Sequence, residues 1–469
     1  RGAPATFRRD KGRRGRQEFP VAGAGRAIMV GVNGAHRRPH HAPPPTRRKR
    51  PPAGPPARVC RLRPAPGLAL GRPRSDFSNV PPRASRFLLP IIYLGFISLG
   101  LPDGTLGVAW PQMHQSLQLP IGLAGTLMLV VTVLSGLSSF SSGAILRRCQ
   151  TGPVVLVSCT LTGSALLLIS QAQNLGWLLL AAAPLGFGAG AVDTGLNSYV
   201  ARHYSGRHMN WLHACWGIGA TCGPLLMTHA LSTRFGWRGG YATIAGLQLG
   251  LALIFLLTLR LWATQPALPP AAGAPAGGQS RGGTLPANSA AGWLSAVVFV
   301  LYVAAELTAG LWAGTILVET RGLSVATAGL CTTVYYGSIT GGRILVGFFV
   351  DRWGNRRLVT LGLGLALPGA LLFTQAASPG WAAGALLLLG LGFAPIYPCL
   401  MHEVPRRFAP EAVLTVIGRQ SGASYVGGAI FPAAAGWLAM QTSLACVPWL
   451  VVAGVGLMAL TIHRLNRLT

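Results

Sequence analysis

Twelve long apolar segments occupy the chain from Phe87 onward, and they constrain its fold more than any other feature. Most are close to the roughly 20 residues that a helix needs to cross about 30 Å of hydrocarbon. Because backbone N–H and C=O groups find no water inside a bilayer, segments of this kind must be helical. The chain is therefore predicted to be an all-α membrane protein with twelve transmembrane helices. The segments are 87–108, 123–146, 153–172, 177–201, 210–231, 240–262, 293–318, 326–350, 358–376, 381–401, 412–440 and 444–465.

The composition agrees with this prediction, since 51% of the residues are hydrophobic and only 10% are charged, which is unusual for a water-soluble protein of 469 residues. Most of the net charge of +29 lies in residues 1–86, which hold 21 Lys and Arg residues and 3 acids. This stretch is rich in Pro, Gly and Arg and cannot bury a core. We interpret it as a disordered basic tail or an artefactual extension of the sequence. Contact of the tail with anionic lipid is an alternative, and no nucleic-acid partner is expected.

A linker rich in Ala, Pro and Gly, residues 263–291, separates six predicted helices in residues 87–262 from six in residues 292–469. Its composition predicts flexibility. Arginines fall on alternate loops, so the positive-inside rule predicts that these loops and both termini are cytoplasmic. The protein is predicted to lie in the cell membrane, which in a bacterium is the inner membrane. The loops on the opposite side hold only Arg234, Arg238 and Arg321. The arginines of the predicted cytoplasmic loops are Arg147, Arg148, Arg202, Arg207, Arg260, Arg281, Arg352, Arg356, Arg357, Arg406, Arg407, Arg464 and Arg467.

The two halves carry a weak internal repeat. A shift of 204 residues places five landmarks of the first half on equivalent residues of the second: Gly143 on Gly347, Gly186 on Gly390, Gly188 on Gly392, Arg202 on Arg406 and Gly223 on Gly427. Internal duplication is typical of secondary transporters. The sequence thus predicts two pseudo-symmetric six-helix halves.

The stretch GGRILVGFFVDRWGNRR, residues 341–357, is the strongest local motif. It resembles the loop signature of the major facilitator superfamily, and the matching residues are Gly347, Asp351, Arg352, Gly354, Arg356 and Arg357. The resemblance implies the major facilitator fold and a gating clamp at the membrane face. Glycines permit close helix approach and a sharp turn, and an acid can pair with basic residues. The copy in the first half has Arg147 where Asp351 would fall, so it lacks the acid of such a clamp. The alternative for the whole motif is a loop whose arginines only follow the positive-inside rule and have no gating role.

Three acids lie inside predicted spans: Asp103, Asp193 and Glu306. A charged side chain costs about 2.5–3.5 kcal/mol or more at the centre of a membrane helix, so such residues usually serve a function. Pro102 and Gly104 flank Asp103 and weaken the helix there. We interpret all three acids as proton-coupling residues that face a central cavity. The alternative for each is a hydrogen bond that packs helices.

Four segments, LGLPDG, GAVDTGLNSYV, NWLHACWGIGA and FVLYVAAE, resemble the fucose and glucose permease branch of that superfamily. Members of this branch are sugar:proton symporters, and the resemblance covers residues 87–469. It implies that Asp103 and Asp193 carry proton coupling and contribute to sugar binding. Many relatives have Glu where this chain has Asp193, which is one methylene shorter.

A sugar offers polar edges and a CH-rich face, so its site needs hydrogen-bonding groups beside flat apolar surfaces. Six residues are candidates for solute binding: Asn197, His213 and Gln420 as hydrogen-bonding groups, and Trp216, Trp312 and Tyr425 as surfaces. Tryptophans in spans also serve as packing or interfacial anchors, and His213 is alternatively an interface residue.

The eight cysteines show neither a disulfide framework nor zinc spacing, and no Walker loop is present. We therefore expect no metal, no cofactor, no ATP-driven step and no enzyme. The leading hypothesis is a secondary transporter for proton-coupled uptake of a sugar or similar small polar solute by alternating access. One alternative is a proton-antiporting exporter of drugs or metabolites, since GIGATCGPLL partly matches an antiporter signature. A nontransporting receptor or scaffold is a further alternative. The expected partners are a small-molecule solute, protons and the lipid bilayer, with the chain as a monomer.

Overall fold

The structure is a computed structural model that describes residues 83–120, 123–262 and 283–469. The chain divides into residues 1–76, which lie outside the described part, and a compact unit, Phe77–Thr469. The prediction of a disordered tail and most of the predicted linker also fall outside the described residues. Everything below concerns the compact unit.

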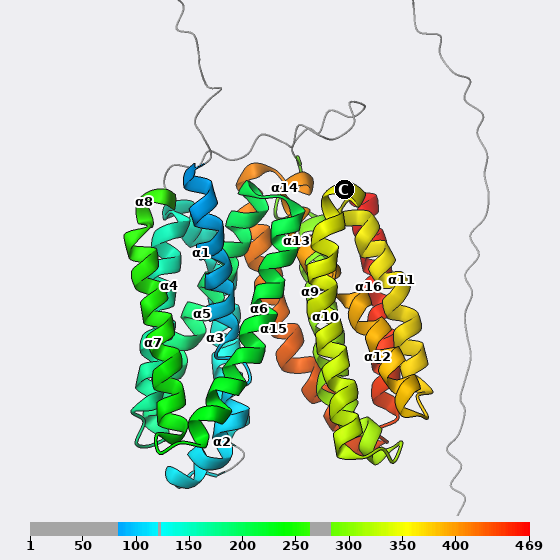
Figure 1. Cartoon of the computed structure of the whole chain (residues 1–469). Coiled ribbons are helices and arrows are strands. Elements are labelled where there is room, and N and C mark those ends of the chain that lie inside the picture. The colour runs from blue at the N-terminus through cyan, green and yellow to red at the C-terminus, as the bar shows by residue number, and fades with distance from the viewer. Residues whose placement is uncertain (1–82, 121–122, 263–282) are drawn as a thin grey trace, which may run out of the picture. The chain divides into compact units, whose positions relative to one another are not determined.

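The described residues form helices connected by short loops (Figure 1). The first half contains α1 (Arg83–Gly100), α2 (Thr105–Ser116), α3 (Leu123–Arg148), α4 (Thr151–Ser170), α5 (Leu175–His203), α6 (Gly206–Leu231), α7 (Gly236–Leu257) and α8 (Leu259–Trp262). The second half contains α9 (Ala290–Glu319), α10 (Val325–Trp353), α11 (Asn355–Thr374), α12 (Pro379–Phe393), α13 (Ile396–His402), α14 (Val404–Arg407), α15 (Pro410–Gln441) and α16 (Cys446–Leu468).

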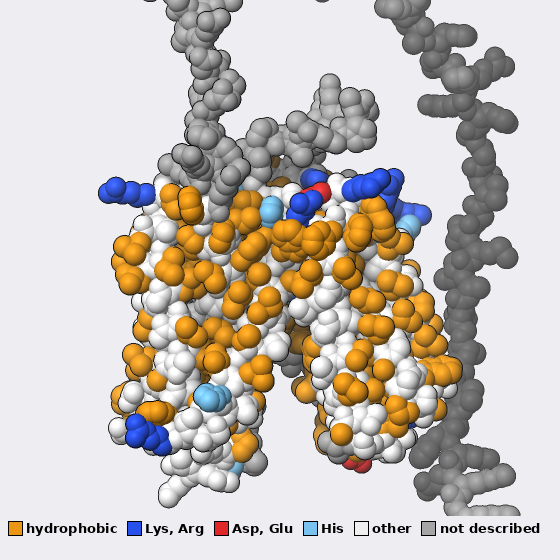
Figure 2. All heavy atoms as spheres, viewed as in Figure 1, with side chains coloured by type: hydrophobic (Ala, Val, Ile, Leu, Met, Phe, Trp, Pro, Cys, Tyr) orange, Lys and Arg blue, Asp and Glu red, His pale blue; other side chains and the backbone are white. Residues whose placement is uncertain are grey.

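These helices account for all twelve predicted spans, so the predicted all-α membrane fold is confirmed. In the described part of the chain, ten helical segments are long and apolar enough to cross a membrane. The other two spans are α6 and α10, which have the required length but contain more glycine and polar residues. Large apolar side chains cover the outer surface, as Figure 2 shows, and Leu257, Leu330 and Met440 are among those exposed. Such a surface suits lipid rather than water.

The first predicted span, 87–108, is interrupted in the structure. Residues 101–104 form a turn between α1 and α2, with Gly104 at a φ of 75°. This left-handed conformation favours glycine, and Pro102 offers no N–H to continue the helix. The Thr105 hydroxyl donates to the Pro102 carbonyl at 2.6 Å and holds the turn. Asp103 therefore sits in a break inside the membrane-spanning segment.

Packing of the paired glycines supports the internal repeat. A Cβ at Gly223 would overlap the carbonyl of Leu101, the residue that follows α1. A Cβ at Gly427 would overlap the Val300 carbonyl of α9. Both glycines thus let equivalent helix pairs approach closely, α6 on α1 and α15 on α9. The other paired glycines follow the same rule: Gly186 and Gly390 face α3 and α10, Gly188 and Gly392 face α4 and α11, and Gly143 and Gly347 face α15 and α6.

The two halves stand side by side, and α3 packs against α15 while α6 packs against α10 across the interface. They meet at the end where α14 and the C-terminus lie, and they separate toward the end of α2 (Figure 1). We call these the clamp end and the open end. Most Lys and Arg side chains visible in Figure 2 gather at the clamp end.

The last part of the predicted flexible linker is packed onto the second half. Leu285 forms a β-bridge with Phe408, and the Ala409 amide donates to the Leu285 carbonyl at 3.0 Å. The Arg419 guanidinium donates to the Ala287 carbonyl at 2.6 Å. Helix α9 then begins at Ala290, two residues before the predicted boundary. Residues 283–289 are therefore held in place, contrary to the prediction for residues 263–291 as a whole.

Candidate solute-binding cavity

A cavity of about 430 Å³ lies between the two halves. The hollow between the halves at the open end is visible in Figure 2. All three acids singled out in the sequence, Asp103, Asp193 and Glu306, line this cavity. Most other lining residues are apolar or small, so a few polar groups set its chemistry.

Asp103 is exposed in the turn between α1 and α2. Its Oδ2 atom accepts a hydrogen bond from the Trp216 indole Nε1 at 2.9 Å. Trp216 belongs to α6 and also lines the cavity. The broken helix and the neighbouring tryptophan together hold a carboxylate at the cavity wall, and no basic residue in the described part of the chain forms an ion pair with it.

Asp193 on α5 is buried, with 8% of its surface exposed. Its Oδ1 atom accepts from the Asn197 amide nitrogen at 2.9 Å, one helical turn away. The Asn197 oxygen lies 3.1 Å from His213 Nε2, so this imidazole nitrogen is the donor. Asn197 itself is fully buried and lies behind the cavity wall. Asn197, one of the predicted solute-binding residues, thus links Asp193 to His213, and we leave it out of the proposed solute contacts.

Glu306 on α9 forms an ion pair with Arg343 on α10, with 3.3 Å between Oε1 and Nη2. Both side chains are buried. The Tyr302 hydroxyl also lies 3.3 Å from Arg343 Nη2, and the Tyr335 hydroxyl donates to the Glu306 carbonyl at 2.8 Å. The second half thus places one acid and one base together at the cavity.

Arg343 is the residue that sequence reasoning missed. It lies inside the predicted span 326–350, where a guanidinium is as costly as a carboxylate. Only one other arginine, Arg419, lies as deep in a predicted span. Applying the test used for the acids to the arginines would have found both.

Three of the six predicted solute-binding residues line the cavity: His213, Trp216 and Tyr425. Trp312 and Gln420 do not. The Trp312 indole donates to the Pro432 carbonyl at 3.0 Å, and its ring covers Gly436. Gln420 is buried and donates to the Ser295 hydroxyl. Both side chains hold helices together, and we leave them out of the proposed site.

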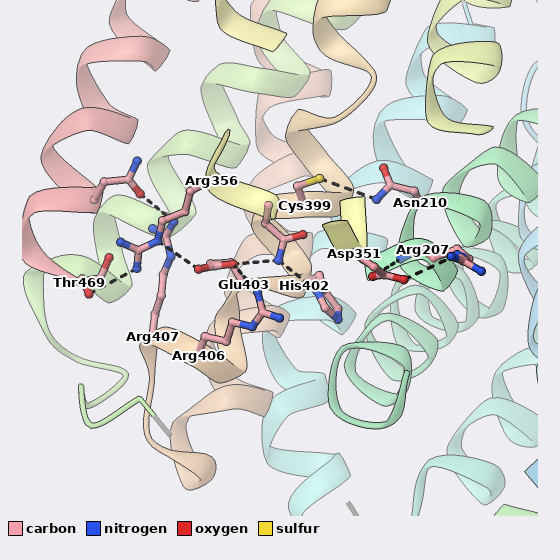
Figure 3. A network of polar contacts seen from close by, with 12 residues as sticks. Arg207, Asn210, Asp351, Arg356, Cys399, His402, Glu403, Arg406, Arg407 and Thr469 are labelled. Carbon is pink, nitrogen blue, oxygen red and sulfur yellow. Dashed lines mark hydrogen bonds and ion pairs between the residues drawn. The ribbon is translucent and has the colours of Figure 1, made fainter. Parts of the chain in front are cut away.

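At the clamp end, Asp351 joins the two halves. Its carboxylate accepts from the Ser205 hydroxyl at 2.8 Å and the Arg207 amide at 3.3 Å, and it lies 3.7 Å from Arg207 Nε. Figure 3 shows Asp351 and Arg207 facing each other. Asp351 is on α10, whereas both partners lie at the start of α6. The acid of the motif therefore pairs across the halves instead of with the arginines of its own loop.

Arg356 takes part in a second polar network at this end (Figure 3). Its Nε atom lies 3.1 Å from Glu403 Oε1, and Asn355 donates to Glu403 Oε2 at 2.8 Å. The same Asn355 amide lies 3.1 Å from His402 Nδ1. His402 Nε2 then lies 3.0 Å from the Tyr204 carbonyl of the first half. The network supports a second contact between the halves.

Burial lowers the pKa of Arg407, on α14 in the same network, to about 10, although the nearby Glu403 opposes this shift. Arg407 Nη2 donates to Asn466 Oδ1 at 2.8 Å. Since this pKa stays well above neutral pH, the side chain keeps its charge and holds α14 against α16.

The two motif glycines, Gly347 and Gly354, lie where a side chain or a regular backbone would not fit. Gly347 lets the Trp211 ring of α6 lie directly on α10, where the Trp211 indole donates to the Ile344 carbonyl at 3.2 Å. Gly354 has a φ of 82° at the turn from α10 to α11. Arg352 and Arg357 are exposed and make no ion pair within the described residues. They fit the alternative of a basic loop.

The first-half copy of the motif makes a comparable contact despite its missing acid. Arg147 donates to the Thr415 hydroxyl of α15. A Cβ at Gly143 would lie 2.8 Å from the Leu414 carbonyl, so α3 and α15 are closely packed. Contacts between the halves are thus duplicated along with the helices.

Two repeated six-helix halves around a cavity that is closed at one end define the architecture of a secondary carrier. The sequence model of the Major Facilitator Superfamily matches residues 92–401 and 294–467. The chain belongs to this family.

Several solved structures share the fold. The human organic anion transporter MFSD10 is 18% identical, with a TM-score of 0.63 over 82% of this chain and 100% of that one. The Escherichia coli fucose:proton symporter is 15% identical, with a TM-score of 0.61 over 80% of this chain and 98% of that one. A bacterial homologue of the iron transporter ferroportin, in its outward-facing state, is 15% identical, with a TM-score of 0.62 over 81% and 99%. At these identities the likeness concerns the fold.

Proposed function

We propose that this protein is a proton-coupled carrier that takes up a small sugar-like or polyol-like solute by alternating access. The observation that carries the proposal is the pair of cavity carboxylates, Asp103 and Asp193, whose hydrogen bonds come from neutral donors. Without a fixed positive partner among the described residues, a carboxylate at the wall of a cavity between membrane-spanning helices is free to gain and lose a proton. The fold shared with the fucose:proton symporter supports this proposal.

Alternating access requires the clamp end to open as the open end closes. The contacts that hold the clamp end shut include the partly exposed pair Asp351–Arg207. Exposed pairs of this kind contribute about 0–1 kcal/mol each. Solute binding can therefore shift the balance between the two states. Because one chain contains both halves and the cavity, we propose that the monomer is the working unit.

Proton-driven antiport of a cationic solute is the second candidate function. The observation that favours it is the same pair of acids, because a cation could replace the protons at two carboxylates that form no ion pair with any basic residue the structure describes. Aromatic side chains at the cavity wall, Trp216 and Tyr425, also suit a cation.

Transport in proteoliposomes separates the two candidates. An inward proton gradient is expected to accumulate solute inside the vesicles under symport, and a protonophore should abolish that accumulation. The solutes for this assay come from a thermal-shift screen of sugars, polyols, sugar acids and organic amines. Accumulation driven only by an outward proton gradient would instead show antiport. Protein-free liposomes are the control.

We further propose that the clamp end faces the cytoplasm, because the arginines gather there. Reporters placed after Arg148, between residues 265 and 280, and after Arg467 should all report a cytoplasmic location. A reporter placed between α9 and α10 should report the opposite side. An external signal from the central linker would contradict the proposed orientation.

A further inference from the structure

Arg343 is held unusually loosely for a buried guanidinium. It is 3% exposed and lines the cavity. Its Nη2 atom lies 3.3 Å from both Glu306 Oε1 and the Tyr302 hydroxyl, and Nη1 lies 3.5 Å from the His213 carbonyl. Charge-assisted hydrogen bonds are usually about 2.7–2.9 Å long. The Nε atom has no acceptor among the described residues. The guanidinium therefore has donor capacity that the protein leaves unused.

These long contacts leave the donors of one planar fork weakly engaged, and such a fork matches the two oxygens of a carboxylate. The Trp216 ring lies 5.9 Å from Arg343 Cζ, so an aromatic surface flanks the fork. We infer that Arg343 binds the carboxylate of the transported solute, which makes that solute a hydroxylated carboxylic acid such as a sugar acid rather than a neutral sugar. This inference rests on the proposed function and specifies its substrate class.

Glu306 gives the site a proton dependence. An ionised Glu306 occupies Arg343 and repels an incoming carboxylate, whereas a protonated Glu306 releases the guanidinium. Binding of the acid and protonation of Glu306 therefore favour each other, and this coupling is reciprocal. One proton on Glu306 then accompanies one solute carboxylate on Arg343. Binding of the solute therefore adds no net charge to the cavity.

Several other titratable groups face this pair. They are Tyr302 on α9, Tyr335 and Tyr336 on α10, His213 on α6, Tyr397 on α13 and Tyr425 on α15, with Asp103 and Asp193 across the cavity in the first half. The tyrosines are neutral near neutral pH, and His213 donates through Nε2 to Asn197. The groups that compete with Glu306 for the proton are therefore Asp103, Asp193 and the other ring nitrogen of His213, Nδ1. A substitution of Glu306 alone shows whether the pH dependence of binding comes from Glu306 or from the other titratable groups.

Binding of matched pairs in detergent tests the inference: gluconate with glucitol, glucuronate with glucose, and galacturonate with galactose. Thermal stability and tryptophan fluorescence report binding at a mildly acidic and a mildly alkaline pH. At least one acid should bind tenfold or more tightly than its neutral partner, and more weakly at alkaline pH. Arg343→Gln should abolish the preference, and Arg343→Lys, which keeps the charge but not the planar fork, should reduce it without abolishing it. Glu306→Gln should bind the acid equally at both pH values.

Arg419→Gln is the matched control, because Arg419 is also an arginine within a span but contacts the Ala287 carbonyl and Asn288 away from the cavity. If Arg343→Gln leaves Glu306 unpaired and fails to fold, the double variant Arg343→Gln/Glu306→Gln removes both charges together. It should fold and lack the preference for acids.

Three outcomes would overturn the inference: neutral members that bind as tightly as the acids, no binding of any of the six solutes, or an acid preference that survives Arg343→Gln. Failure of the inference is distinct from failure of the proposed function. Proton-driven accumulation of a neutral solute would refute the assignment of Arg343 and leave the carrier mechanism intact. Acid binding without any proton-driven transport would support the assignment of Arg343 and refute the proposed carrier mechanism.

Discussion

Asp193→Asn is expected to abolish proton-driven accumulation while leaving solute binding within about tenfold of the unmodified protein. The amide keeps the size of the side chain, and its oxygen still accepts from Asn197, so the link to His213 survives. What it loses is the ability to take up and release a proton. A carrier that cannot change its protonation at this position can still exchange solute but cannot use the gradient.

The measurement is uptake into proteoliposomes with and without an inward proton gradient, alongside binding in detergent. Glu319→Gln is a suitable control, because this carboxylate is exposed at the end of α9. It should accumulate solute normally. If Asp193→Asn accumulates solute to the unmodified level, the carboxylate only packs helices and the proposed coupling must be abandoned.

Gly347→Leu is expected to reduce transport about tenfold while the protein remains folded. A side chain here would overlap the Trp211 ring and push α10 away from α6. Overpacking of this kind costs about 1–3 kcal/mol, and every 1.4 kcal/mol is tenfold in an equilibrium. Because Gly347 lies between the halves, the strain is relieved when the clamp end opens. The substitution should therefore favour that state.

Cys399 provides a readout of this opening. It is fully buried on α13, where the Asn210 amide of the first half lies 3.8 Å from its sulfur. Alkylation followed by mass spectrometry should be slow in the unmodified protein and faster in Gly347→Leu. Gly341→Leu is the matched control on the same helix, because a side chain there meets open space. Normal transport together with an unreactive Cys399 in Gly347→Leu would contradict the gating role of this contact.

Much of the fold follows from the sequence because the bilayer leaves few alternatives. Apolar segments of span length must be helical. The repeat was visible because helices that pack in the same way need glycine at the same places, as Gly223 and Gly427 do against α1 and α9. The break at Asp103 was predictable for an equally local reason, since Pro102 and Gly104 both oppose a regular helix.

The residues of the candidate site that the sequence predicts are those whose charge is energetically costly inside a membrane. Acids are expensive inside a membrane, so Asp103, Asp193 and Glu306 stood out, and all three line the cavity. Arg343 carries the same cost but lies in a motif whose other arginines belong to a loop. Its pairing with Glu306 depends on the way α9 and α10 cross, which a hydropathy pattern does not describe.

Local sequence patterns predict the membrane-spanning segments, the division into halves and the charges that are unusual inside a span, because each depends on residues near one another along the chain. Contacts between side chains from distant segments come from the tertiary structure alone. Trp216 and Gln420 are equivalent in the repeat, yet Trp216 lines the cavity and Gln420 holds α15 to Ser295. Asp351 stands beside arginines in the chain, yet it pairs with the start of α6. The rotation and crossing of packed helices set these neighbours, and contacts from the whole bundle fix that geometry.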